Sequence, residues 1–116
     1  MQKQEARYYL KQKLLNEDRV LLWSYRKDKH LDLPNELVIE KYLNYGVEKD
    51  LKLLLAAYPF NSIHRIWSYS ILPSSRNYER QILVAKALFN MNAIDAAQYI
   101  EKQKKDRIER ELAGSY

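Results

Sequence analysis

The chain has 116 residues, of which 47% are hydrophobic and 30% are charged, so it can bury one core and remain dissolved. Two glycines and three prolines are too few for the regular turns of an all-β fold. The absence of cysteine excludes disulfides and thiolate metal sites. The net charge of +5 is modest and falls short of the dense basic stripe of a dedicated nucleic-acid binder.

Hydrophobic spacing predicts an all-α fold: a single compact bundle of about five to six helices that forms one domain over residues 1–116. The helical segments are expected at 5–15, 34–46, 48–58, 61–72, 77–91 and 93–112. Residues 20–25 are short and apolar, and 26–32 read as a loop. The helix within 2–15 is one-sidedly basic, and 101–112 is a long charged helix that extends from the core.

Apolar residues three and four apart define the face that each helix should bury. The residues expected on these faces include four large ones, namely Tyr9, Tyr45, Leu55 and Leu83. The segment 77–91 is apolar almost all round and is expected to be central. Gly46 should end its helix in the left-handed conformation, which glycine adopts cheaply.

The charged C-terminal segment offers two acid-first ion pairs at i,i+4, Glu101 with Lys105 and Asp106 with Arg110. Only Ile108 and Leu112 continue its apolar stripe. Two interpretations stay open for 101–112: a solvated extension of the last helix, or a helix that lies on a partner.

Motifs for catalysis are missing from the sequence. Two glycines cannot build a phosphate-binding loop, and no serine has the surroundings of a nucleophile. The two histidines, His30 and His64, are far apart, and His64 is expected at the surface. We therefore expect a protein that is not an enzyme and that has no cofactor and no metal.

No apolar leader is visible at the N-terminus, and no apolar run approaches the ~20 residues of a membrane span. The expected location is the cytoplasm, without a membrane partner.

Candidate partner-binding residues are aromatic or basic. Tyrosine and tryptophan combine a large apolar surface with a polar group, which suits interfaces as well as core edges. Trp67 fits a buried stripe, whereas the surroundings of Trp23 and Tyr25 are less regular. Arginines around the fifth helix could add a basic rim. The candidate set is Trp23, Tyr25, Arg65, Arg76 and Arg80.

Most of the chain, about residues 20–102, resembles a poorly characterised family of short bacterial helical proteins. The similarity rests on apolar and aromatic positions in order: 22–25, 38–46, Asp50-Leu51, Leu54-Leu55, Ile63, Trp67, 76–78, Leu83, Ala85, Leu88-Phe89 and Tyr99-Ile100. Genes of this family often stand beside abortive-infection-type nucleotidyltransferase toxins. The resemblance therefore implies an antitoxin or accessory role, and it carries over no catalytic residue.

Three functional hypotheses follow. The first is a helical protein-interaction module, an antitoxin-like partner of a nucleotidyltransferase-type toxin. The second is a DNA-binding regulator in which 48–58 and 62–70 form a helix-turn-helix with Arg65, Ser68 and Tyr69 outward. The third is a structural homodimer.

Overall fold

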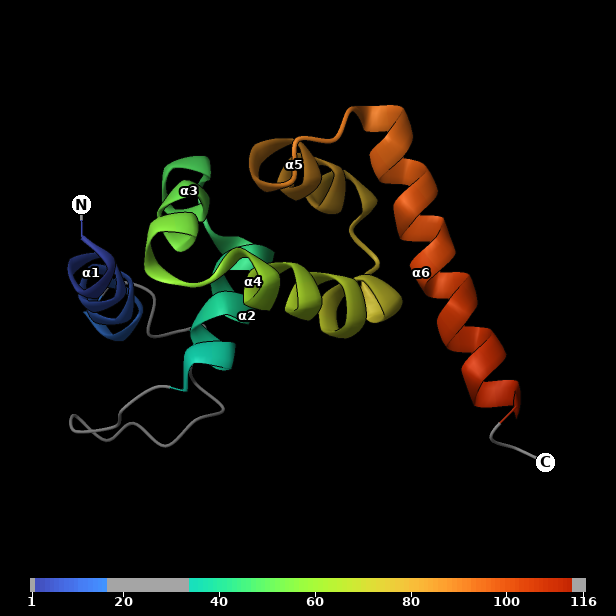
Figure 1. Cartoon of the computed structure of the whole chain (residues 1–116), viewed down its shortest axis with the longest axis horizontal. Coiled ribbons are helices and arrows are strands. Elements are labelled where there is room, and N and C mark those ends of the chain that lie inside the picture. Colours follow the sequence, from blue (N-terminus) through green and yellow to red (C-terminus); the bar gives the residue numbers. More distant parts are fainter. Residues whose placement is uncertain (1, 17–33, 114–116) are drawn as a thin grey trace. The chain divides into compact units, whose positions relative to one another are not determined.

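The computed structural model describes residues 2–16 and 34–113 (Figure 1). These residues are all-helical, as predicted, with six α-helices. The chain divides into two compact units, residues 1–63 and 64–116. The prediction of one domain over residues 1–116 stays a prediction. The segments 20–25 and 26–32, with Trp23, Tyr25 and His30, lie outside the described residues.

The first unit contains three helices, α1 (Lys3–Asn16), α2 (Asn35–Tyr45) and α3 (Glu48–Ala57). Each buries one apolar face, and burial of this kind is the main favourable term in folding. The buried residues are Ala6, Leu10 and Leu14 of α1, Val38, Ile39, Tyr42 and Leu43 of α2, and Leu51, Leu54 and Ala57 of α3. Tyr42 also donates its hydroxyl hydrogen to the carbonyl oxygen of Leu10 at 2.6 Å, so α2 and α1 are joined by a buried hydrogen bond.

Charged residues of α1 also turn inward. Lys13 forms a 2.5 Å ion pair with Asp50, whose side chain is buried on α3. Arg7 donates to the carbonyl oxygen of Ala57 at 2.5 Å, and its guanidinium lies 4.8 Å from the ring centre of Tyr58. Two of the residues that make this helix one-sidedly basic therefore hold the first unit together.

Gly46 follows α2, as predicted, but the expected reason is wrong. Its φ of −69° and ψ of 147° are ordinary extended values that any residue adopts. A Cβ atom at this position would lie 2.7 Å from the carbonyl oxygen of Tyr42 and 3.0 Å from its ring. Close packing of the chain against Tyr42, not backbone freedom, is what requires glycine here.

The second unit is built from the end of α4 (Phe60–Ile66), a π-helix η2 (Trp67–Ile71), a 3-10 turn η3 (Leu72–Ser74), α5 (Tyr78–Leu88) and α6 (Ala93–Ala113). The predicted stripe of Ile63, Ile66, Trp67 and Ile71 is buried. Asn77 and Asn92 cap α5 and α6 by accepting from the backbone N–H groups of Arg80 and Asp95. The prediction of a long charged C-terminal helix is thus confirmed.

An aromatic cluster fills the second unit. Trp67 stacks on Phe89 and Tyr99 with ring centres 4.6 and 5.5 Å apart, and His64 meets the rings of Trp67, Phe89 and Tyr99. The indole N–H of Trp67 donates to the buried Gln81 at 2.9 Å, so its polar atom is satisfied. The expectation that His64 is a plain surface residue is wrong, because the half-buried imidazole belongs to this cluster.

The four large residues expected on buried faces, Tyr9, Tyr45, Leu55 and Leu83, are in fact exposed. Each lies at the edge of a stripe whose centre is buried. Helices of 10 to 14 residues in a small protein bury a narrower face than the spacing suggested. The helix α5 is accordingly buried on one side and not all round.

Candidate groove between the π-helix and the last helix

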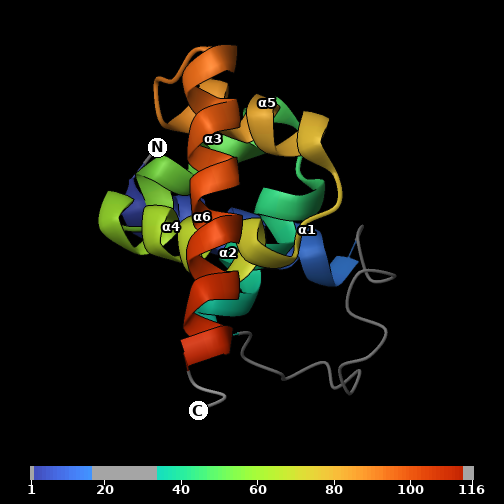
Figure 2. The same ribbon diagram turned by 90° about the vertical axis from the view of Figure 1, so that its right-hand side faces the viewer.

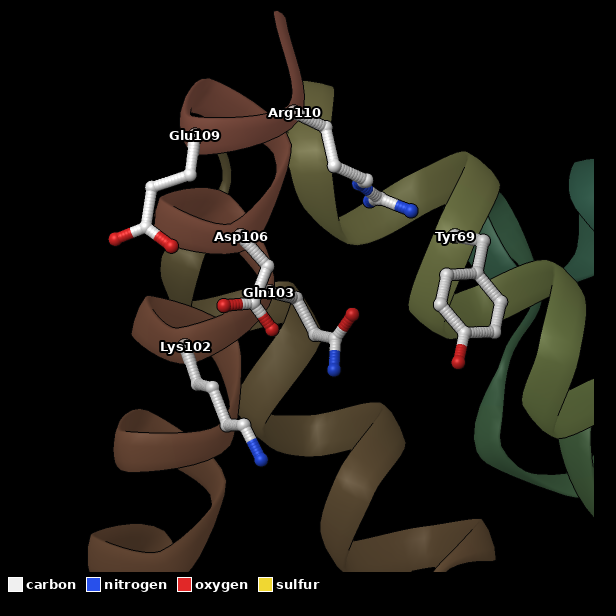
Figure 3. Close-up of a pocket in the computed structure, with 6 residues that line it drawn as sticks. All are labelled: Tyr69, Lys102, Gln103, Asp106, Glu109 and Arg110. Carbon is white, nitrogen blue, oxygen red and sulfur yellow. The ribbon is translucent and has the colours of Figure 1, made fainter. Parts of the chain in front are cut away.

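An open groove of about 510 Å³ lies between η2 and α6 in the second unit. It is lined by Tyr69 from η2 and by Lys102, Gln103, Asp106, Glu109 and Arg110 from α6. An adjoining hollow of about 490 Å³ shares Tyr69 and Arg110 and extends to Pro73 and Arg107. Figure 3 shows the amide of Gln103 and the guanidinium of Arg110 reaching from α6 toward Tyr69.

Tyr69 presents its ring to this groove because the π-helix changes the direction of successive side chains. Its neighbours Ser68 and Trp67 are buried, whereas Tyr69 is 59% exposed. A π-helical turn adds one residue to the helical repeat, and such turns often occur at functional sites. The guanidinium of Arg110 lies 6.0 Å from the ring centre of Tyr69, at the outer limit of a cation–π contact.

Gln103 is the unusual residue of the groove. It continues the buried face of α6 after Ala96 and Ile100, and only 7% of it is exposed. Most of the side chain is buried, but its amide is not one of the enclosed polar atoms that lack a hydrogen-bond partner, so the amide opens onto the groove and its solvent. Water can satisfy this amide in the free protein, and a partner that displaces the water must offer hydrogen bonds in its place. The amide is therefore set to bind a group that offers both an acceptor and a donor.

The groove is electrically balanced. Lys102 and Arg110 contribute two positive charges, and Asp106 and Glu109 contribute two negative ones, so the sum is zero. A phosphate backbone would meet two carboxylates here and would gain little from the two cations. A polypeptide with apolar and charged side chains of both signs fits this lining better.

The ion pairs of α6 differ from the predicted ones. Lys105 lies 4.0 Å from Glu109, and Arg107 lies 3.0 Å from Glu111. Glu101 instead accepts a 2.7 Å hydrogen bond from the hydroxyl of Tyr78. This hydrogen bond, followed by burial and by the charge of Glu101, raises the pKa of Tyr78. Asp106 and Arg110, the second predicted pair, both line the groove.

The candidate residues from the sequence lie elsewhere. Arg65 is exposed on α4, Arg76 is exposed just before α5, and Arg80 is half-buried on α5, where burial lowers its pKa. None of these three lines the groove. Trp23 and Tyr25 are outside the described residues. The sequence reasoning missed Gln103, although a polar residue on the buried stripe of a helix was a usable signal.

One detail of the helix-turn-helix hypothesis, the outward direction of Ser68, is wrong. Expected to point outward, Ser68 is fully buried, and its hydroxyl lies 2.7 Å from that of Tyr99. The α-helix expected to read DNA also ends at Ile66 and continues as η2.

Neither a metal-binding cluster nor a membrane-spanning helix occurs within the described residues. No three or more His, Asp or Glu side chains come together there in a group that could hold a metal ion. No helix in residues 2–16 and 34–113 is both long and apolar enough to cross a membrane. In comparisons with known proteins, no family model, no curated protein and no solved structure matches this chain.

Proposed function

We propose that this chain is a non-enzymatic helical module that binds a protein through the groove between η2 and α6. The observation that carries the proposal is the amide of Gln103, which extends from the buried face of α6 into the groove and toward the exposed ring of Tyr69. A peptide group supplies both the acceptor and the donor that a glutamine amide needs. Tyr69 then serves as the aromatic anchor beside it.

The partner that we propose is a nucleotidyltransferase-type toxin encoded beside this chain, which makes the module antitoxin-like. This identity rests on the family resemblance of residues 20–102. The groove adds the expected mode of binding: a segment of the partner places its backbone on Gln103 and an apolar side chain on Tyr69. Its charged side chains face Asp106 and Arg110.

The test is a calorimetric titration of the product of the adjacent gene into the purified chain. Tyr69→Ala should weaken binding by about 30-fold, because an aromatic anchor at the centre of an interface typically contributes about 2 kcal/mol. Tyr8→Ala is the matched control, since Tyr8 is a similarly exposed tyrosine on α1. Equal affinities of both variants and the wild type would contradict the proposed site.

The salt dependence of the binding affinity distinguishes protein binding from DNA binding. Protein binding that depends on Tyr69 should survive moderate salt, because burial of apolar surface is not screened. Binding to duplex DNA should lose about 0.9 log units of affinity per log unit of salt for each phosphate contact. Tight, sequence-selective DNA binding that is lost in Arg65→Ala, together with no binding to the adjacent gene product, would favour the DNA-binding hypothesis instead.

A further inference from the structure

The outward face of α6 is a second surface, distinct from the groove. Three large apolar residues of this helix are exposed: Ile94 (71%), Ile108 (57%) and Leu112 (58%). Successive helical residues turn by about 100°, so these three lie within about 40° of one another. Gln103 lies about 180° around the helix from Leu112. Figure 2 shows α6 from the side on which no other helix of its unit covers it.

These apolar residues belong to a heptad pattern. Positions 94, 98, 101, 105, 108 and 112 alternate in steps of four and three, which is the spacing of a coiled-coil seam. We call this set the outer seam; its members are Ile94, Gln98, Glu101, Lys105, Ile108 and Leu112. All six are exposed. The seam is apolar at its ends and carries opposite charges in its middle.

We propose that the outer seam binds the outer seam of a second copy of this chain in an antiparallel, two-fold symmetric pair. In this arrangement Glu101 of each copy faces Lys105 of the other, and Ile94 faces Leu112. Gln98 faces Ile108, where its aliphatic stem can pack while its amide stays in water. A two-fold interface must be complementary to itself, and the charges of this seam satisfy that condition.

A parallel pair does not satisfy it. It would place Glu101 against Glu101 and Lys105 against Lys105, and like charges at facing positions are destabilising. The seam therefore selects one orientation. Within residues 2–16 and 34–113, neither Glu101 nor Lys105 has a strong competing ion pair, since Lys105 lies 4.0 Å from Glu109 and is 77% exposed.

The seam is short, so the pair should be weak. It occupies 19 residues of one helix, or about 28 Å at 1.5 Å per residue, and buries less area than a stable dimer interface. Self-association should therefore appear between about 10 µM and about 1 mM, the range expected for a small interface. This pairing requires no other protein and leaves Gln103 and Arg110 on the far side of α6.

Charge-swapped variants test the inference in sedimentation equilibrium. Glu101→Lys and Lys105→Glu, each alone, should stay near the monomer mass of 13.9 kDa, because each places like charges opposite one another. An equimolar mixture of the two variants should associate, since each seam then faces the opposite charge. The double variant Glu101→Lys with Lys105→Glu should associate like the wild type.

Two controls isolate the seam. Tyr78→Phe removes the hydrogen bond to Glu101 without changing any seam charge, so it should associate like the wild type. Lys52→Glu changes an exposed lysine on α3 and should also have no effect. Far-UV circular dichroism checks that all variants are folded. A wild-type protein that remains at 13.9 kDa, or a mixture that associates no better than its components, would overturn the proposal.

Discussion

The two compact units use their polar side chains in opposite ways. In the first, Arg7 and Lys13 turn inward and join α1 to α3 through Ala57 and the buried Asp50. In the second, aromatic stacking around Trp67 fills the core, while Gln103 and Arg110 are directed into an open groove. The most basic stretch of the sequence is thus partly structural. The balanced, less conspicuous stretch on α6 is the better candidate for a binding surface.

The spacing of residues in the sequence was sufficient to predict the features of the two units that depend on local structure. The stripe of Ile63, Ile66, Trp67 and Ile71 and the caps Asn77 and Asn92 follow from residues three or four apart. The groove depends on Tyr69 and Gln103, which are 34 residues apart, and on a π-helical turn without a distinct sequence signature. The inward direction of Lys13 depends on Asp50, 37 residues away.

The largest expected effect is on the aromatic core of the second unit. Trp67→Ala should lower the free energy of unfolding by about 3–5 kcal/mol, since it removes a fully buried indole and leaves Gln81 without its donor. Urea denaturation followed by circular dichroism measures this change. Trp67→Phe, which keeps the stack but loses the hydrogen bond, should cost less. A loss below about 1 kcal/mol in Trp67→Ala would show that the cluster does not stabilise the unit.

The ion pair of the first unit should have the next largest effect. Lys13→Met should destabilise the protein by about 3 kcal/mol, because it takes the ion-pair partner from a buried carboxylate. The double variant Lys13→Met with Asp50→Leu should recover much of this loss, since no buried charge remains. If the single variant were as stable as the wild type in urea denaturation, the inward role of Lys13 would be refuted.

A smaller effect is expected at the junction of α2 and α3. Gly46→Ala should cost about 1–3 kcal/mol, because the new Cβ atom would lie 2.7 Å from the carbonyl oxygen of Tyr42. The midpoint of thermal unfolding should fall accordingly. An unchanged or higher midpoint would indicate that the backbone yields at this position and that close packing is not what requires glycine.

The smallest effect is expected for the end of α6. A chain cut after Gln103 loses the hydrogen bond from Lys104 to the carbonyl oxygen of Ser75 but few buried contacts. It should remain folded, with a loss of about 1 kcal/mol, while binding to the adjacent gene product becomes weaker, because Asp106 and Arg110 are removed from the groove. Unfolding of the truncated chain, seen by circular dichroism, would mean that the charged half of α6 is needed for the core.

Gln103→Leu tests the central claim most directly, because it separates folding from binding at one residue. If the amide is held for a partner, leucine should not lower the free energy of unfolding, since it keeps the buried face of α6 apolar and the described residues offer the amide no hydrogen bond that the fold would lose. The same variant should bind the adjacent gene product at least about tenfold more weakly, the effect of losing about 1.4 kcal/mol of hydrogen bonding. Parallel urea denaturation and calorimetric titration give both values. A variant that is less stable than the wild type yet binds with unchanged affinity would contradict the account, because Gln103 would then serve the fold alone.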